Sequence, residues 1–186
     1  MKTLVIHPLD PTTSFLCKIY EEKLWSPDWN LIRGQVSKSE LKRQIKAHDR
    51  IIMLGHGTDD GLLKSPSKGG FGFVIDSILV YLLREKICVC IWCNADVFFL
   101  KYKLKGFCTG MIISDYEEAL MFCLYPFRNS DIEESNVLFA KCVKESIDKP
   151  TMILEMTKNY TSETNPVIKF NSENIFATNG YLKQTS

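Results

Sequence analysis

The sequence predicts an α/β protein with a mostly parallel sheet, helices on both faces of that sheet, and one domain spanning residues 1–186. Short apolar runs alternate along the chain with stretches whose apolar residues have helical spacing. Two of the runs, at residues 51–54 and 87–92, are almost wholly apolar, which is typical of parallel strands buried on both faces. A chain of 186 residues is long enough for one well-buried core and short for two.

Capping residues mark the first elements in order. Asp10 followed by Pro11 suits the start of a helix, because a proline at the first helical position lacks only an amide that has no partner there. Ser37 and Glu40 match a capping box at the start of the next helix. Strands are expected at residues 2–7, 30–33 and 50–54, with Gly34 ending the second.

A long glycine-rich segment, from Gly55 to Phe73, follows the third strand. Segments of this length in a compact domain usually serve a function or contain a small hairpin, here expected from residues 62–63 and 71–74. The glycine run at 68–72 matches no phosphate-binding motif and is interpreted as a flexible lid.

The second half of the chain continues the alternation, beginning with a helix capped by Asp76. A strand order of 2-1-3-4-5 would place the first, third and fourth strands side by side. The expected elements are strands at 87–92 and 107–113, helices at 94–103, 131–147 and 152–160, and an extended segment at 167–170.

A histidine and a cysteine each follow one of the buried strands directly. His56 stands between Gly55 and Gly57 after the third strand, and Cys93 follows the fourth. The carboxyl ends of neighbouring parallel strands meet at one edge of a sheet, so His56 and Cys93 can face each other as base and nucleophile. The amide of Gly57 can donate to an oxyanion. If Cys93 begins a helix, the helix dipole favours its thiolate.

Each of these residues also has an ordinary structural explanation. A histidine after a strand can cap a turn, and most free cysteines are small buried apolar residues. Cys90 and Cys93 form a C-x-x-C pattern, which leaves a redox dithiol open as an alternative. A zinc site would need a second pair of ligands that the sequence lacks, so no metal is expected. The matching placement of His56 and Cys93 favours the dyad over these alternatives.

Four further polar residues lie close to predicted strand ends and are candidates to bind a substrate or ligand: His7, Asp10, Asn94 and Asp115. The two carboxylates suit a cationic group of the substrate. Both also have the alternative role of a helix N-cap, which is common for aspartate.

Composition excludes several functional classes. The formal net charge of +1 provides no electrostatic footprint for nucleic acid. No run approaches the ~18 apolar residues of a membrane span, and the first apolar run is too short for a secretory signal. Three of the seven cysteines crowd one predicted strand, where mutual disulfides are sterically awkward. We therefore expect a protein of the reducing cytoplasm, without membrane or nucleic-acid partners and without a cofactor.

The two strand ends resemble those of clan CD cysteine peptidases, the group of caspases, metacaspases, gingipains and separases. These enzymes place His-Gly after one hydrophobic strand and Cys after the next, as residues 51–57 and 87–93 do here. The resemblance implies a caspase-like three-layer α/β sandwich. It also implies that His56 is the general acid or base, that Cys93 is the nucleophile, and that the amides of Gly57 and Cys93 form the oxyanion hole.

The chain departs from caspases around the cysteine. Caspases carry Gln-Ala before it and Gly two places after it, whereas here Ile91-Trp92 precede and Ala95 follows. The arginines of the caspase S1 pocket have no counterpart, so a preference for aspartate is not implied. Asp10 and Asp115 suit a basic P1 residue better, as in metacaspases.

The wider chain resembles small bacterial caspase-like effectors of Thoeris-type antiphage systems. There a TIR-domain partner makes a cyclic ADP-ribose derivative that activates the protease. The resemblance implies a polypeptide substrate, a small cyclic nucleotide activator that orders the segment from Gly55 to Phe73, and a TIR-domain partner protein. The alternative is a non-catalytic nucleotide-binding sensor on the same α/β scaffold, in which Cys93 is incidental. The matching stretches are 6–8, 10–13, 53–57, 91–96, 104–111 and 134–136.

Overall fold

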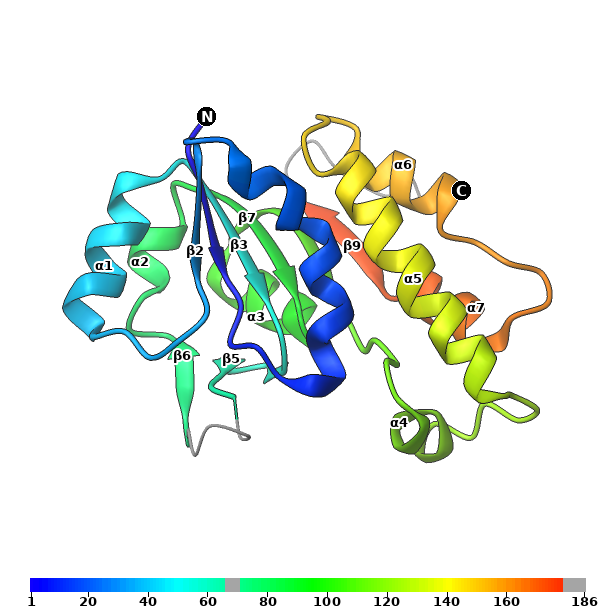
Figure 1. Cartoon of the computed structure of the whole chain (residues 1–186). Coiled ribbons are helices and arrows are strands. Elements are labelled where there is room, and N and C mark those ends of the chain that lie inside the picture. Colours follow the sequence, from blue (N-terminus) through cyan, green and yellow to red (C-terminus); the bar gives the residue numbers. More distant parts are fainter. Residues whose placement is uncertain (66–70, 179–186) are drawn as a thin grey trace.

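A six-stranded sheet forms the centre of the molecule in the computed structural model, which describes residues 1–65 and 71–178 (Figure 1). The strand order is β2-β1-β3-β7-β8-β9, and every pairing is parallel except that of β8 with β9. The first five parallel strands thus have the order 2-1-3-4-5, which places the first, third and fourth of them side by side. The strands are β1 (Thr3–Ile6), β2 (Trp29–Ile32), β3 (Arg50–Leu54), β7 (Ile87–Ile91), β8 (Lys105–Thr109) and β9 (Ile175–Thr178).

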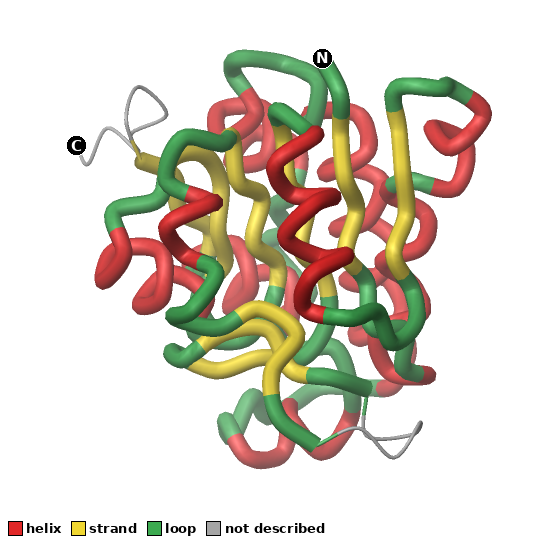
Figure 2. Tube along the Cα trace, turned by 90° about the vertical axis from the view of Figure 1, so that its left-hand side faces the viewer, coloured by secondary structure: helices red, strands yellow, loops and turns green. Residues whose placement is uncertain are grey.

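Helices cover both faces of this sheet (Figures 1 and 2). One hydrophobic core lies between the sheet and η1, α5, α6 and α7, and a second lies between the sheet and α1, α2 and α3. The predicted α/β class with a mostly parallel sheet is confirmed, and the layering is consistent with a three-layer sandwich. The helices are η1 (Pro11–Ile19), η2 (Glu21–Trp25), α1 (Lys38–Ala47), α2 (Val80–Leu83), α3 (Ala95–Tyr102), α4 (Tyr116–Met121), α5 (Asn129–Ser146), α6 (Met152–Asn159) and α7 (Pro166–Glu173).

The central strands are apolar at successive positions because both of their faces are covered. Ile52 packs into the core under η1 and α5, whereas its neighbour Ile51 packs into the core under α1 and α2. All five residues of β3 are buried. Among the described residues, none of the helices combines the length and apolar character that a membrane span requires.

A small antiparallel sheet lies below the carboxyl ends of the central strands (Figure 2). It consists of β4 (Gly57–Thr58), β5 (Gly61–Leu63) and β6 (Phe73–Ile75). The hairpin predicted within this segment is therefore present as β5 and β6, and β4 is an additional strand. Most of the glycine run interpreted as a lid, residues 68–70, lies outside the described residues.

Two predictions in the second half of the chain are wrong. The segment predicted as extended, residues 167–170, lies inside α7, because Asn165 caps this helix by accepting hydrogen bonds from the amides of Val167 and Ile168. Pro166 then occupies the first turn. The fifth strand, predicted at 107–113, is β8 and ends at Thr109. The strand β9 and the helix α4 had no prediction.

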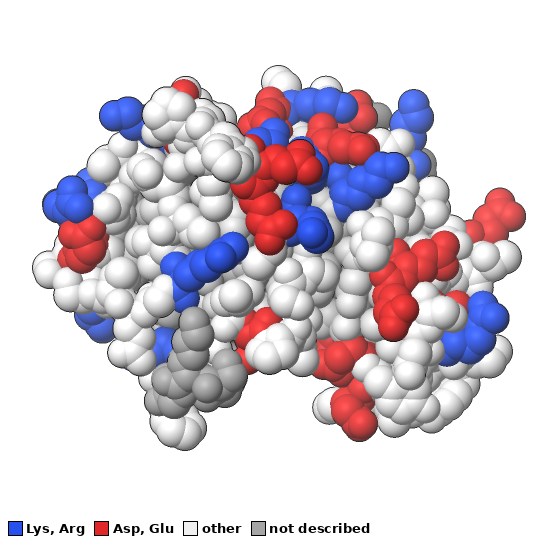
Figure 3. Space-filling model, in the orientation of Figure 1, with Lys and Arg blue, Asp and Glu red and all other residues white. Residues whose placement is uncertain are grey.

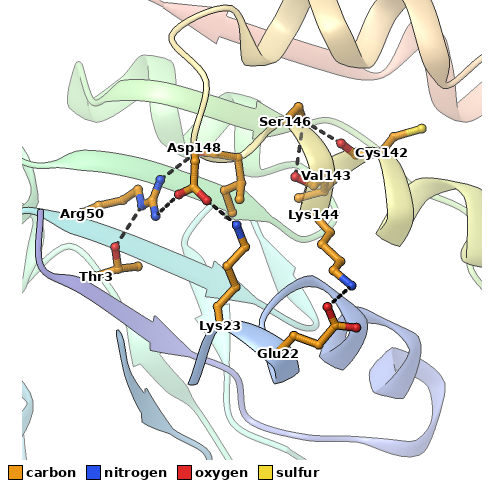
Figure 4. A network of polar contacts seen from close by, with 10 residues as sticks. Thr3, Glu22, Lys23, Arg50, Cys142, Val143, Lys144, Ser146 and Asp148 are labelled. Carbon is orange, nitrogen blue, oxygen red and sulfur yellow. Dashed lines mark hydrogen bonds and ion pairs between the residues drawn. The ribbon is translucent and has the colours of Figure 1, made fainter. Parts of the chain in front are cut away.

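A buried arginine joins the amino end of the sheet to the end of α5 (Figure 4). The side chain of Arg50 is 3% exposed and donates hydrogen bonds to Thr3 Oγ1 (3.1 Å), to the carbonyl of Ile147 (2.7 Å) and to Asp148 Oδ1 (2.8 Å). Lys23 contacts the other oxygen of Asp148. This network stabilises the end of the sheet opposite to the predicted site.

Candidate active site

The carboxyl ends of β1, β3 and β7 meet at one edge of the sheet, next to the small sheet and the loop before α4 (Figure 1). Leu54 at the end of β3 pairs with Ile91 at the end of β7. The amide of Gly55 extends this contact by donating to the carbonyl of Ile91 at 3.1 Å. His56 and Cys93 are each two residues beyond this last pair, so both follow neighbouring strands at the same edge of the sheet.

Gly55 turns the chain out of β3 into the small sheet. Its φ of +140° lies in a region that only glycine adopts easily, which explains the glycine before His56. The side chain of His56 is 32% exposed at this turn. The ring is therefore partly accessible and lies at the edge where α/β proteins bind their ligands.

A threonine and an aspartate hold the ring of His56. Thr12 Oγ1 lies 2.7 Å from His56 Nε2 and donates its own hydrogen to Asp10 Oδ1 at 2.9 Å. Because the single hydroxyl proton of Thr12 is committed to Asp10, Thr12 must accept from Nε2, and this assigns the neutral ring as the Nε2–H tautomer. The lone pair is then on Nδ1, which is the nitrogen that can accept a proton.

Asp10 lies beside the ring of His56 and accepts a hydrogen bond from Thr12. Its Oδ1 lies 3.6 Å from His56 Nε2. The same oxygen accepts from the amide of Thr12 as the N-cap of η1. The N-cap alternative for Asp10 is confirmed, and direct binding of a substrate cation by Asp10 stays a prediction.

His7 does not reach the edge where His56 and Cys93 lie. Its side chain is fully buried, with Nδ1 2.9 Å from the hydroxyl of Tyr20 and Nε2 3.3 Å from Thr13 Oγ1. Burial and the positive charge of Arg33 lower the pKa of His7 to about 4. This placement does not favour the predicted contact between His7 and a ligand, since no atom of the side chain faces solvent. His7 instead supports the start of η1.

Cys93 lies in a turn that the loop after β8 holds in place. Its sulfur donates to the carbonyl of Ile112 at 3.6 Å, and the amide of Asn94 donates to the carbonyl of Gly110. Asn94 is exposed and has a left-handed backbone with φ of +65°, which asparagine tolerates better than most residues. The side chain of Asn94 is thus accessible to a ligand, as the prediction for it requires.

The thiol of Cys93 is protonated at neutral pH. Burial, together with the carboxylates of Glu118 and Asp115, raises the pKa of Cys93 to about 11. The thiolate was expected to be favoured by a helix dipole if Cys93 began a helix, and this condition is not met because α3 begins only at Ala95. Burial is the main cause of the raised pKa of Cys93. A base is needed to remove the proton.

Two carboxylates, those of Asp115 and Glu118, interact electrostatically with the sulfur of Cys93. Figure 3 shows acidic side chains on both sides of an indentation at the lower edge of the molecule. Asp115 caps α4 by accepting from the amide of Glu118 at 2.9 Å, as its N-cap alternative requires. Glu118 accepts from the amide of Ser114 at 2.7 Å, and burial raises the pKa of Glu118. Glu118 interacts electrostatically with both His56 and Cys93.

Gly57 has a structural reason to be glycine as well as a chemical one. A Cβ at this position would lie 2.1 Å from Cδ1 of Trp92, whose indole also donates to the carbonyl of Thr58. In the β4–β5 ladder the amide of Leu63 donates to the carbonyl of His56, so the alternation of the ladder directs the amide of Gly57 away from β5. That direction leaves the amide available to an oxyanion.

Within the described residues, no hydrogen bond joins the imidazole of His56 to the sulfur of Cys93. Catalytic hydrogen bonds often tighten only when a substrate is bound.

Cys90 is fully buried inside β7, and burial raises its pKa well above the ordinary value, which does not favour the redox alternative. The described residues contain no group of His, Cys, Asp and Glu side chains that could hold a metal ion.

Two residues of this site were not predicted from the sequence. Thr12 contacts His56 across 44 positions, a pairing that no local pattern indicates. Glu118 had a usable signal, because Asp115 and Glu118 have the spacing of an N-cap and a third helical residue.

A search with protein-family models found no match to this chain, and a search of curated protein sequences found no significant similarity.

Replacing Glu118 with glutamine is expected to make Cys93 more reactive. Removing the negative charge lowers the pKa of the thiol, so a larger fraction is thiolate at pH 8, while glutamine can still accept from Ser114. We expect a rise of roughly two- to fivefold in the rate of alkylation, since the more acidic thiolate is also a weaker nucleophile. The measurement is iodoacetamide labelling of Cys93 followed by mass spectrometry.

The control for this experiment is Glu117→Gln, which removes an exposed charge from the same helix. Both variants carry Cys123→Ser, because Cys123 is the exposed free cysteine in the described residues. An equal labelling rate in the two variants would show that Glu118 does not act on the thiol.

Proposed function

We propose that this protein is a caspase-like cysteine endopeptidase in which His56 and Cys93 form the catalytic dyad. The observation that carries the proposal is the support of His56 by Thr12 and Asp10, which leaves Nδ1 as the proton acceptor. His56 follows β3, and Cys93 follows the neighbouring strand β7. A histidine that only capped a turn would not need its tautomer fixed by a threonine and an aspartate. The layered α/β architecture supports the caspase-like assignment.

The proposed reaction begins with the neutral thiol. Nδ1 of His56 takes the proton of Cys93 while the sulfur bonds to the carbonyl carbon of the scissile peptide, and the amide of Gly57 donates to the oxyanion. Asp10 stabilises the imidazolium. His56 then gives the proton to the leaving amine as the C–N bond breaks, which leaves a thioester. Water hydrolyses the thioester and regenerates the thiol.

The charge around the site favours a substrate with a basic side chain next to the cleaved bond. Asp115 and Glu118 both act electrostatically on the sulfur. A cationic P1 side chain would be attracted to this region and would also offset the effect of both carboxylates on the thiol. Activation by a cyclic ADP-ribose derivative from a TIR-domain partner in antiphage defence remains a prediction from the resemblance.

The experiment uses a peptidyl acyloxymethyl ketone with arginine at P1, which alkylates a catalytic cysteine. The protein is incubated with this probe in the presence and absence of cyclic ADP-ribose, and the labelled residue is identified by mass spectrometry. We expect labelling of Cys93 in wild type and in Cys90→Ala, and none in Cys93→Ala or His56→Ala.

A matched probe with aspartate at P1 tests the preference for a basic side chain, and we expect it to label more slowly. Equal labelling of wild type and His56→Ala, or no labelling of Cys93 in either condition, would contradict the proposal and favour the non-catalytic sensor. Loss of labelling in Cys90→Ala with retention in His56→Ala would favour the redox dithiol.

A further inference from the structure

A second pocket lies beside the candidate active site, at the carboxyl ends of β1 and β2. It is open to solvent and has a cavity volume of about 130 Å³. Pro8, Val36, Leu41, Phe73 and Val74 form its apolar walls. Pro8 also contacts the turn that positions His56, because its Cδ lies 3.7 Å from where a Cβ on Gly55 would be.

Among the described residues, the charged side chains that line this pocket are all cations: Arg33, Lys38 and Lys64. Lys38 lies 3.9 Å from Asp76, whereas neither Arg33 nor Lys64 forms an ion pair with any described residue. Two cations without carboxylate partners at one apolar pocket match a ligand that has both an anionic group and an apolar part. The pocket is thus opposite in charge to the acidic surroundings of Cys93.

Arg33 extends from this pocket into the buried cluster beneath η1. Its Nε and Nη2 both lie 3.4 Å from the hydroxyl of Tyr20, and that hydroxyl lies 2.9 Å from Nδ1 of His7. His7 Nε2 in turn contacts Thr13, which is adjacent in sequence to the Thr12 that holds His56. Polar contacts therefore run from the wall of the pocket to Thr13, one residue away from the Thr12 that holds His56.

We propose that this pocket binds a small organic phosphate, with Arg33 and Lys64 on the phosphate, and that the bound ligand shifts Arg33 and through it the support of His56. A phosphate offers Arg33 charge-assisted hydrogen bonds that are stronger than its long contacts to the neutral Tyr20 hydroxyl. Binding would draw the guanidinium toward the ligand and change the contacts of Tyr20 and His7. The regulatory half of the proposal rests on the proposed function, whereas the binding site does not.

The binding experiment uses phenyl phosphate as the probe, with inorganic phosphate and phenol as its two halves, followed by NMR titration of the whole protein. We expect saturable binding of phenyl phosphate that is tighter than that of either half. Arg33→Gln and Lys64→Gln should each weaken it by about tenfold. Lys46→Gln, which removes an exposed charge from the far end of α1, is the control and should bind as wild type does.

The coupling experiment follows the histidine ring signals, since the chain has only three histidines. Binding should shift the ring signals of His7 and His56 in wild type. His48, whose Nδ1 contacts the carbonyl of Gln44 at the opposite end of the sheet, should be unchanged. In Tyr20→Phe the probe should still bind while the shift of the His56 signals is reduced.

The outcomes separate this proposal from the proposed function. Absence of saturable binding, or equal binding by the Arg33 and Lys64 variants, overturns the site whether or not Cys93 reacts with the peptidyl probe. Binding without any change in the ring signals of His7 and His56 overturns the coupling. Binding with the expected shifts in a protein that shows no peptidase labelling would retain the site and reject only the peptidase.

Discussion

Alanine in place of His56 is expected to lower the rate of peptide cleavage by about 10³- to 10⁴-fold. The neutral thiol of Cys93, with its pKa raised to about 11, supplies almost no thiolate at neutral pH, so removal of the base should affect nearly the whole reaction. The measurement is kcat/KM for a peptide that wild type cleaves, with circular dichroism to confirm that the variant is folded. A loss of less than about tenfold would contradict the role of His56 as the base.

Thr12→Val tests the support of the ring separately from the ring itself. Valine keeps the shape of threonine but cannot accept from Nε2 of His56 or donate to Asp10, so the tautomer is no longer held. We expect a loss of about 10- to 100-fold in kcat/KM, comparable to losses for residues that orient a catalytic ligand. Thr12→Ser, which retains the hydroxyl, should restore most of the activity. Failure of serine to restore it would indicate that Thr12 matters only through packing.

Arg50→Ala should lower the stability of the fold although Arg50 lies far from the site. The guanidinium is 3% exposed, stacks over Trp29 at 5.0 Å and satisfies the carbonyl of Ile147 and the hydroxyl of Thr3. Its removal leaves these acceptors without a donor and opens a space between β3 and the end of α5. We expect the free energy of unfolding to fall by about 2–4 kcal/mol, measured by urea denaturation.

Arg43→Ala is the matched control, because Arg43 pairs with Glu40 on the exposed surface of α1. Its substitution should leave the free energy of unfolding nearly unchanged, because water screens an exposed ion pair. A change below about 1 kcal/mol for Arg50→Ala would show that water replaces the lost contacts. Activity at the opposite end of the sheet should be unchanged at temperatures where the variant is folded.

The Arg50 network also predicts a dependence of stability on pH. Burial opposes ionisation of Asp148, but the hydrogen bonds from Lys23 and Arg50 outweigh it and hold the pKa of Asp148 below the ordinary value of 3.8. A lowered pKa in the folded state means that the stabilisation is present above pH 3.8 and is lost as the pH falls through the folded-state pKa. The stability difference between wild type and Asp148→Asn should therefore disappear in acid.

Local patterns were sufficient to predict most of the fold. The apolar runs of β1, β3 and β7 are continuous because these strands are buried on both faces, and this feature is visible without any knowledge of their neighbours. The prediction failed near the C-terminus, where Asn165 and Pro166 begin a helix at a position interpreted as extended. Short apolar segments such as residues 167–170 suit a strand or a helix equally, and here the cap decides.

The candidate site, like the fold, was predicted from the sequence only in part. The sequence alone predicts that His56 and Cys93 each follow a buried strand, because each position depends only on where its own strand ends. The tertiary structure alone determined that Thr12 and Asp10 hold the ring, that His7 is buried, and that Glu118 lies near the sulfur. These contacts join residues that are far apart in the chain, and they exist only because parallel strands bring the loops after β1, β3, β7 and β8 to one edge of the sheet.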